Sequence, residues 1–234
     1  MNNVVHVIGA GLAGCEAAYQ LAKRGIQVKL YEMKPAKYSP AHHSENFAEL
    51  VCSNSLRSDE LSNAVGLLKE ELRRVGSLIM ECAEATRVEA GGCLAVDRGG
   101  FARMVTEKIK NHPNITVISE EVTEVPEGPV IIATGPLTSD GLSKAIGEYF
   151  GETGYLHFFD AAAPLVTAES IDMSLAWWQS RYDRGTPDYI NCAMNREQYE
   201  AFMQELTTAE EAEVHGFEDK NVFEGCMPVE VMAR

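Results

Sequence analysis

A glycine-rich loop, Gly9-Ala10-Gly11-Leu12-Ala13-Gly14, constrains the fold of this chain more than any other feature. It follows the apolar run Val4–Ile8 and opens a segment of helical character, Leu12 to Arg24. In a dinucleotide-binding unit the first glycine permits the tight turn, the second lets the backbone approach a pyrophosphate, and the third lets helix pack on strand. The N–H groups at the helix start favour phosphate charge. The loop therefore predicts a bound dinucleotide.

An acidic residue stands where such a site needs one. Glu32 follows a second apolar run, Gln27–Tyr31, and lies 18 residues after Gly14. A carboxylate there can accept hydrogen bonds from ribose hydroxyls. A chance glycine-rich turn is the alternative, and the strand, helix and acid in register disfavour it. We expect an α/β fold, a Rossmann-like doubly wound sheet that binds FAD or NAD(P).

A second cofactor signal lies further along the chain. The apolar strand Val130–Ala133 runs into the small-residue turn Ala133-Thr134-Gly135, as in a strand buried in a parallel sheet. In flavoproteins an A-T-G turn lies beside the cofactor, because small residues permit close backbone approach. The two signals together favour tightly held FAD over a diffusing NAD. The predicted cofactor-binding residues are Gly9, Ala10, Gly11, Leu12, Ala13, Gly14, Glu32, Ala133, Thr134 and Gly135.

Arg98 joins this set with an alternative left open. It follows Ala95-Val96-Asp97 and leads into a predicted helix, Gly99–Asn111. A basic residue at that place either contacts a ribose or phosphate of the cofactor or pairs with Asp97.

Other segments have clear periodicity. Helical spacing of apolar residues predicts helices over Asp59–Val75 and Leu78–Ala85. Short apolar runs predict strands at Ile115–Ile118 and Val122–Val125. Asn195, with Gln198 in capping-box register, predicts the start of a further helix.

The domain organisation follows from these elements. Residues 1–135 are expected to form the FAD-binding Rossmann-like domain, residues 136–224 an inserted α+β unit, and residues 225–234 the start of a return to the first domain. The run Val229–Arg234 resembles a strand that has only begun. We therefore expect this chain to be the N-terminal portion of a longer protein.

Composition narrows the function classes. The net charge of −15 argues against a general nucleic-acid binder, which needs Lys and Arg to displace counterions. No apolar run approaches the ~20 residues that span a bilayer, and no export signal is recognisable. We expect a cytoplasmic protein without a membrane span. Its six cysteines lack C-x-x-C or zinc-ligand spacing, so disulfides and a metal site are not expected.

Two cysteines have neighbouring residues that could make the thiol reactive. Cys52 lies among short polar residues in Val51–Arg57, and a nearby arginine can favour a reactive thiolate. Cys226 lies on the constrained turn Glu224–Pro228, which can present a nucleophile. Packing in a loop is the alternative for both, whereas Cys15 and Cys82 are expected in the core.

Several sequence motifs of this chain together resemble those of a known family. The runs Tyr31–Pro35, Cys52–Ser55 and Phe223–Glu230 resemble those of the bacterial folate- and FAD-dependent tRNA (uracil-5-)-methyltransferases, and the resemblance extends over essentially the whole sequence. Such enzymes move a one-carbon unit from methylenetetrahydrofolate to C5 of a T-loop uridine in tRNA, forming 5-methyluridine. Reduced FAD supplies electrons, and NADH or NADPH re-reduces it.

The resemblance also implies residue roles. Cys226 matches the proposed nucleophile of the family, and Cys52 matches a second cysteine assigned to proton removal or to support of the flavin intermediate. Residues 136–224 match the side that faces substrate and tRNA. The family is longer than this chain, and the oligomeric state stays open.

Two other functions compete with this one. A flavoprotein that modifies the wobble uridine of tRNA shares the glycine loop and Cys15-Glu16, but does not predict the Glu224–Pro228 turn. The other is an incomplete flavin-binding module without activity, suggested by the way the chain ends at the apparent strand start Val229–Arg234.

Overall fold

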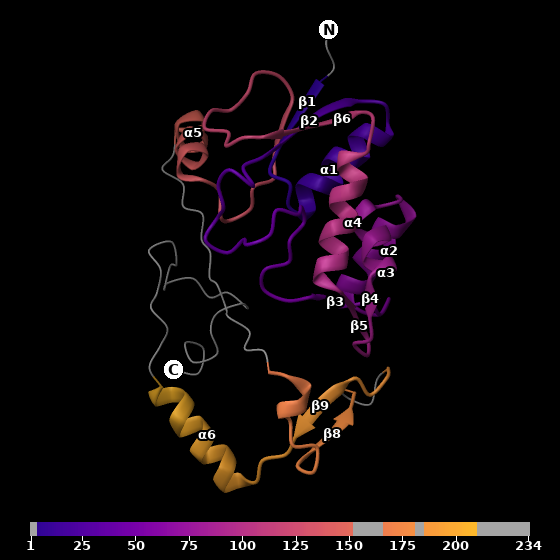
Figure 1. Cartoon of the computed structure of the whole chain (residues 1–234), viewed down its shortest axis with the longest axis vertical. Helices are drawn as coiled ribbons and strands as arrows, with labels where there is room; N and C mark the ends of the chain where they lie inside the picture. Colours follow the sequence, from indigo (N-terminus) through magenta and orange to yellow (C-terminus); the bar gives the residue numbers. More distant parts are fainter. Residues whose placement is uncertain (1–3, 152–165, 181–184, 210–234) are drawn as a thin grey trace. The chain divides into compact units, whose positions relative to one another are not determined.

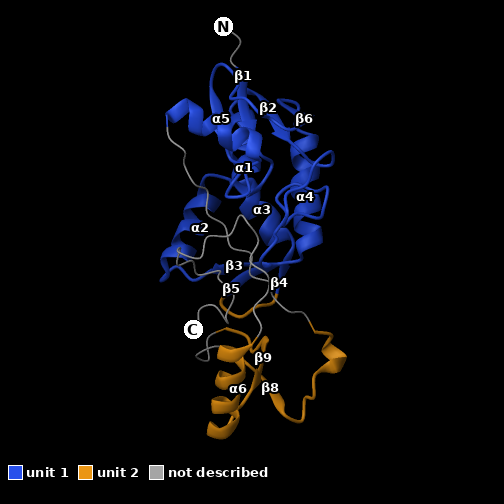
Figure 2. Ribbon diagram, turned by 90° about the vertical axis from the view of Figure 1, so that its left-hand side faces the viewer, with its two compact units in different colours: residues 1–88, 93–156 blue, residues 89–92, 157–234 orange. Residues whose placement is uncertain are grey.

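The computed structural model describes residues 4–151, 166–180 and 185–209 (Figure 1). Cys226 and the predicted strand Val229–Arg234 lie outside the described residues. The chain divides into two compact units, Met1–Val88 with Cys93–Leu156, and Glu89–Gly92 with His157–Arg234 (Figure 2). The first unit includes α5 (Asp140–Phe150). The functional boundaries expected from the sequence, 1–135, 136–224 and 225–234, stay a prediction.

A four-stranded parallel sheet forms the centre of the first unit. Its order is β6-β2-β1-β7, with β1 (Val4–Ile8), β2 (Gln27–Glu32), β6 (Ile115–Ser119) and β7 (Val130–Ile132). Ile8 is in register with Tyr31 on one side and with Ile132 on the other. The carboxyl ends of β1, β2 and β7 therefore lie side by side, where open α/β sheets bind their ligands. The predicted Rossmann-like α/β fold is confirmed.

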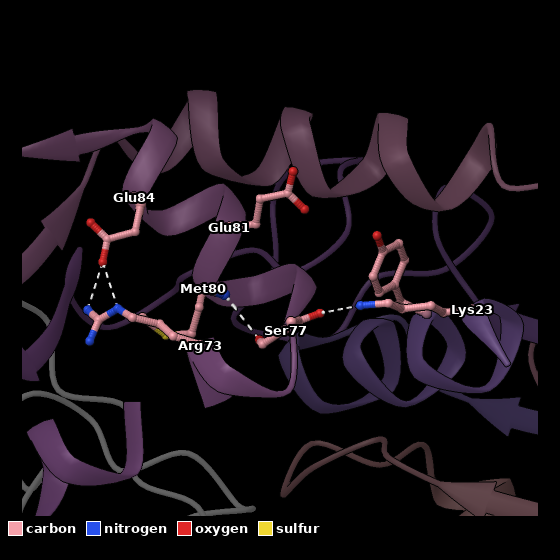
Figure 3. Close-up of a pocket in the computed structure, with 8 residues that line it drawn as sticks. Lys23, Arg73, Ser77, Met80, Glu81 and Glu84 are labelled. Atoms are coloured by element: carbon pink, nitrogen blue, oxygen red, sulfur yellow. Dashed lines mark hydrogen bonds and ion pairs between the residues drawn. The ribbon is translucent and has the colours of Figure 1, made fainter. Parts of the chain in front are cut away.

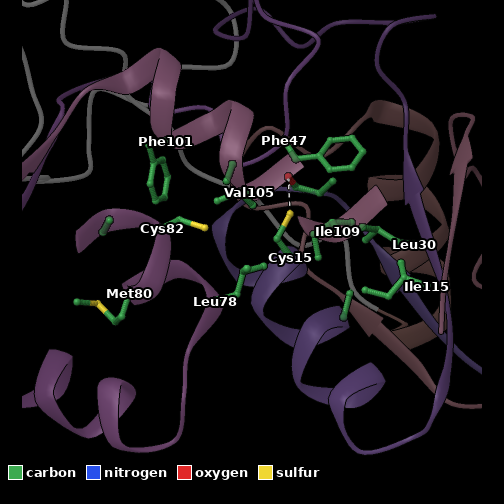
Figure 4. Close-up of a cluster of buried hydrophobic side chains, with 14 of the residues drawn as sticks. Cys15, Leu30, Phe47, Leu78, Met80, Cys82, Phe101, Val105, Ile109 and Ile115 are labelled. Atoms are coloured by element: carbon green, nitrogen blue, oxygen red, sulfur yellow. Dashed lines mark hydrogen bonds between the residues drawn. The ribbon is translucent and has the colours of Figure 1, made fainter. Parts of the chain in front are cut away.

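Three helices bury the main core: two pack on this sheet, and the third packs against those two (Figure 4). They are α1 (Leu12–Lys23), α3 (Leu78–Ala85) and α4 (Arg98–Lys110). Cys15 and Cys82 are fully buried among them, as predicted. Burial raises the pKa of the Cys15 thiol far above its ordinary value and that of Cys82 to about 11. Both thiols are therefore protonated packing groups and not nucleophiles.

The carboxylate of Glu16 links α1 to α3 through hydrogen bonds. Glu16 of α1 accepts hydrogen bonds from the Ser77 hydroxyl at 2.8 Å and from the Ile79 amide at 3.0 Å. Ser77 in turn accepts a bond from the amide of Met80. These contacts satisfy N–H groups at the start of α3 that have no partner within the helix.

Helix α2 is shorter than predicted and turned differently. It spans Ala64–Arg74, because Asn63 accepts a bond from the Val65 amide and starts the helix there. The apolar row expected on its inner face is Leu61, Val65, Leu68, Leu72 and Val75. Leu61 is 62% and Leu68 56% exposed, whereas Leu72 packs against the main core. The buried positions are instead Gly66, where a Cβ would lie 2.1 Å from the Glu60 carbonyl oxygen, and Lys69. Close backbone approach therefore decides which face of α2 turns inward.

The prediction of a strand at Val122–Val125 is wrong. This segment has no strand pairing, and Val122 packs instead against a small cluster of Ile8, Tyr31 and Leu142. Apolar residues can be buried from a loop without joining a sheet, and the sequence pattern does not distinguish the two cases.

A small antiparallel sheet of the first unit has no counterpart in the sequence analysis. Its order is β3-β5-β4, with β3 (Ser55–Ser58), β4 (Arg87–Val88) and β5 (Cys93–Val96). The register of β3 on β5 is irregular between Ser55 and Ser58, and Arg57 has a φ of +68°. This bulged pairing places the segment after Cys52 directly against β5.

The described part of the second unit holds a hairpin, a short 3-10 turn and one longer helix. Strands β8 (Ala176–Gln179) and β9 (Tyr189–Cys192) are antiparallel, and η1 spans Ala168–Ser170. Helix α6 (Arg196–Thr208) begins at the predicted capping box of Asn195 and Gln198. Among the described residues, no helix is both long and apolar enough to cross a membrane.

Candidate functional site

The two predicted cofactor signals meet in space. Gly9 has a φ of +95°, and a Cβ there would lie 2.7 Å from the carbonyl oxygen of Ala133. The amide of Ala133 donates to the carbonyl of Ile8 at 2.8 Å. A Cβ on Gly14 would lie 1.8 Å from the carbonyl oxygen of Gly9. The glycine loop, the start of α1 and the A-T-G turn therefore pack so closely that side chains are excluded.

Gly11 differs from its neighbours in the loop. A Cβ at this position would meet no atom within 4 Å. Gly11 is also the N-cap of α1, and no side chain caps the helix there. The helix start thus presents backbone N–H groups and its positive dipole end to open space, as a phosphate-binding loop requires.

Glu32 ends β2 next to the glycine loop. Its Oε2 accepts a hydrogen bond from the amide of Ala10 at 3.0 Å, and its Oε1 accepts one from the amide of Lys34 at 3.1 Å. The residue is only 9% exposed. Since a carboxylate offers about four acceptor sites, it keeps capacity for a ribose hydroxyl while holding the loop.

The A-T-G turn is held by a threonine that the sequence analysis did not single out. The Thr138 hydroxyl donates to the Gly135 carbonyl at 2.8 Å and lies 2.5 Å from the Thr134 hydroxyl. Gly135 has a φ of +66°, which favours glycine. A threonine three residues after such a turn is the local signal that could have identified this contact.

The loop after β2 is organised by a buried lysine, also missed by the sequence analysis. Lys34 Nζ donates to the carbonyls of Ser44 at 3.0 Å and Asn46 at 2.6 Å, and lies 3.4 Å from Glu49 Oε2. The Ala48 amide then donates to the Ala10 carbonyl at 2.9 Å. The segment that leads to Cys52 is thereby fixed to the glycine loop.

Within that loop, His42 and Ser39 form a hydrogen bond. The Ser39 hydroxyl lies 2.5 Å from His42 Nδ1. Burial, helped by the Lys34 charge, lowers the pKa of His42 below its ordinary value. His42 is therefore a neutral hydrogen-bonding group at pH 7, whereas His43 is exposed.

The structure brings Cys52 and Arg98 together. Cys52 is exposed, and Arg98 Nη2 donates to its carbonyl oxygen at 3.2 Å. Among the described residues, Asp97 forms no ion pair with Arg98 and is instead the N-cap of α4. Its Oδ1 accepts from the Gly100 amide at 2.6 Å and caps α4. Cys226, the other predicted catalytic residue, lies outside the described residues.

A separate hollow of about 280 Å³ lies between α1, the end of α2 and α3 (Figure 3). Its charged groups are engaged: Arg73 lies 2.7 Å from Glu84, and Lys23 Nζ donates to the Gly76 carbonyl at 3.4 Å. It is lined by Tyr19, Lys23, Arg73, Gly76, Ser77, Met80, Glu81 and Glu84, none of which belongs to the predicted site.

Comparisons with known proteins give a consistent result. The profile of the family described as glucose inhibited division protein A matches residues 4–234. A protein of Acetivibrio thermocellus named methylenetetrahydrofolate–tRNA-(uracil-5-)-methyltransferase TrmFO is 66% identical over 100% of this chain and 54% of its own length. The Bacillus subtilis protein of the same name is 61% identical over 98% of this chain and 53% of its own length. The chain thus spans about half the length of these relatives.

Solved structures give weaker matches. The GidA protein of Aquifex aeolicus aligns with a TM-score of 0.46 at 17% identity, covering 56% of this chain and 25% of its own. A GidA-related protein of Thermus thermophilus aligns with a TM-score of 0.34 at 17% identity, covering 58% of this chain and 54% of its own.

Proposed function

Because the chain belongs to the glucose inhibited division protein A family, we propose that it is a flavin- and folate-dependent tRNA (uracil-5-)-methyltransferase. It transfers a one-carbon unit from methylenetetrahydrofolate to C5 of a T-loop uridine, forming 5-methyluridine. The observation that carries this proposal is the 66% identity, over the full chain, with a relative of that name.

The residues at the sheet edge fit FAD. Gly9 and Gly14 permit the close packing of the loop, and Gly11 leaves open space in front of the uncapped start of α1. In this proposal the amides of Leu12 and Ala13 hold the pyrophosphate, and Glu32 accepts from a ribose hydroxyl. Ala133, Thr134 and Gly135 form the adjoining small-residue wall. Bound FAD, reduced by NADH or NADPH, supplies the electrons that turn the transferred carbon into a methyl group.

Two cysteines perform the steps on the uracil ring. The Cys226 thiolate adds to C6, which makes C5 an enolate carbon able to attack the one-carbon unit. After that bond has formed, Cys52 removes the proton from C5, and the bond from the transferred carbon to the folate nitrogen breaks to release tetrahydrofolate. A hydride equivalent from the reductant completes the methyl group, and the sulfur of Cys226 then leaves C6. The exposure of Cys52 supports a role that requires contact with a substrate.

The partners follow from this reaction. They are tRNA, recognised at its T-loop, and the folate co-substrate. We place the protein in the cytoplasm, where its thiols stay reduced.

The test is methyl transfer to a T-loop transcript with labelled methylenetetrahydrofolate, FAD and NADH or NADPH. The intact chain should produce labelled 5-methyluridine, and Cys226→Ala should abolish it. The Bacillus subtilis relative is the positive control, and an anticodon-loop transcript is the substrate control. Undiminished turnover in Cys226→Ala would remove the nucleophile assignment. Labelling of only the anticodon loop would favour wobble-uridine modification, and no product beside an active relative would favour a flavin-binding module without activity.

A further inference from the structure

The backbone around Cys52 is tied to the junction between β5 and α4. The Val96 amide donates to the Asn54 carbonyl at 3.0 Å, and Asn54 Nδ2 donates to the Val96 carbonyl at 3.1 Å. Arg98 Nη2 adds a third bond, to the Cys52 carbonyl at 3.2 Å. Two of these bonds hold Asn54, and the bond from Arg98 holds the carbonyl of Cys52.

Arg98 is placed to act on the thiol as well as on the backbone. A cysteine sulfur lies within about 5 Å of its own carbonyl oxygen by covalent geometry, so the Arg98 charge lies within roughly one Debye length of the thiol. Arg98 is also the first residue of α4, and the bonds between Val96 and Asn54 bring the positive end of that helix close to the cysteine loop. Both effects favour a thiolate over a neutral thiol.

Three further charged residues lie on the described segments that adjoin this loop. On the β5–α4 junction, Asp97 caps the helix through the amide of Gly100. On the segment before the cysteine, Glu49 accepts bonds from backbone amides and pairs with Lys34. On β3, Arg57 is exposed and adds a second positive charge beyond the bulge.

We propose that Arg98 is a positioning residue for Cys52, which fixes the carbonyl of the cysteine and holds a positive charge beside its thiol. This inference rests on the proposed function only in giving Cys52 a role in proton removal. It assigns Arg98 to the cysteine loop, whereas the sequence alone suggested a contact with the cofactor or with Asp97.

The test is the pH dependence of Cys52 alkylation by iodoacetamide in the intact chain, followed by peptide mass spectrometry. Arg98→Gln should move the midpoint of the rate profile upward by about half a pH unit, which is about threefold in rate at neutral pH. Arg98→Lys keeps the charge and should restore most of the rate. Cys192, exposed in the second unit, is the internal reference whose profile should not move.

Arg103→Gln is the matched control, because it removes another exposed arginine from the same helix. An unchanged Cys52 midpoint in Arg98→Gln overturns the proposal, as does an equal shift in the lysine variant or in Arg103→Gln. The result is independent of methyl transfer. A shifted alkylation profile in a chain without methyltransferase activity leaves this inference standing and removes the proposed function, and the converse holds as well.

Discussion

At the scale of single residues, the glycines of the loop differ in what a methyl group would do. A Cβ on Gly14 would lie 1.8 Å from the Gly9 carbonyl oxygen, whereas one on Gly11 meets nothing within 4 Å. We expect Gly14→Ala to lower the free energy of unfolding by about 2–3 kcal/mol, because loop or helix must shift. Gly11→Ala should lower it by less than about 1 kcal/mol. Thermal unfolding of both variants without FAD measures the difference.

The variants Gly14→Ala and Gly11→Ala also distinguish an effect on folding from an effect on cofactor binding. Gly11→Ala places a methyl group where the backbone is expected to meet the pyrophosphate, so FAD affinity should fall by about tenfold or more. Flavin fluorescence titration of the folded variant measures this. Equal destabilisation by the two substitutions, or unchanged FAD affinity in Gly11→Ala, would contradict the assignment.

Local spacing predicted Gly9, Gly14 and Glu32 because their roles depend on a single strand–turn–helix–strand unit. Lys34 and Thr138 were missed for a physical reason. Whether a buried ammonium group stabilises a loop depends on which distant carbonyls accept its hydrogen bonds in the folded chain. The periodicity of the sequence carries no information about those partners. Cys52 was predicted from its surroundings, but its contact with Arg98 lies next to the pairing of β3 with β5, which the sequence pattern did not predict.

At the scale of elements, a charge cluster joins α2 and the segment before it to α3 and β4. Asp59 accepts from Arg73 at 2.5 Å and from Arg87 at 3.0 Å, and both arginines also bond Glu84. Burial alone would raise the pKa of Asp59, but the hydrogen bonds and charges of the two arginines hold it below the ordinary value of 3.8. The ionised carboxylate therefore stabilises the folded state.

Asp59→Asn should reveal this contribution through its pH dependence. Because the folded pKa lies below the unfolded one, the stabilisation is complete above about pH 4 and is lost as pH falls through the folded pKa. At pH 7 the variant should be less stable by about 1–2 kcal/mol, and the difference should shrink below pH 4. Urea unfolding across this range measures it. Glu148→Gln, in an exposed pair with Lys144, is the control, and a difference independent of pH would contradict the account.

Helix α2 shows that periodicity can predict a helix without predicting which of its faces is buried. The spacing of apolar residues predicts a buried stripe of Leu61, Val65, Leu68, Leu72 and Val75. Three of them, Leu61, Leu68 and Val75, are more than half exposed, whereas Leu72 packs against the main core. The inward face instead contains Gly66, which the Glu60 backbone approaches, and Lys69, which donates to the Ser58 carbonyl at 2.9 Å. Helix type was predictable from the sequence, but the buried face depends on neighbours that only the folded chain supplies.

At the scale of the whole molecule, the division into two compact units determines what a bound flavin can stabilise. Every predicted FAD residue, from Gly9 through Glu32 to Gly135, belongs to the first unit. A ligand that binds only the folded state stabilises it in proportion to the logarithm of ligand concentration over Kd, about 2.7 kcal/mol at a hundredfold excess. The unfolding transition of the first unit should therefore respond to FAD.

Calorimetry of the intact chain tests this at increasing FAD. The transition that includes the first unit should rise by roughly 5–10 °C at a hundredfold excess over Kd, since each kcal/mol shifts a domain of this size by about 2–4 °C. Any separate transition of the second unit should stay fixed, and Gly11→Ala should suppress the shift. A chain that unfolds at the same temperature with and without saturating FAD would show that the glycine loop, although correctly packed against Ala133, does not hold the cofactor in this chain.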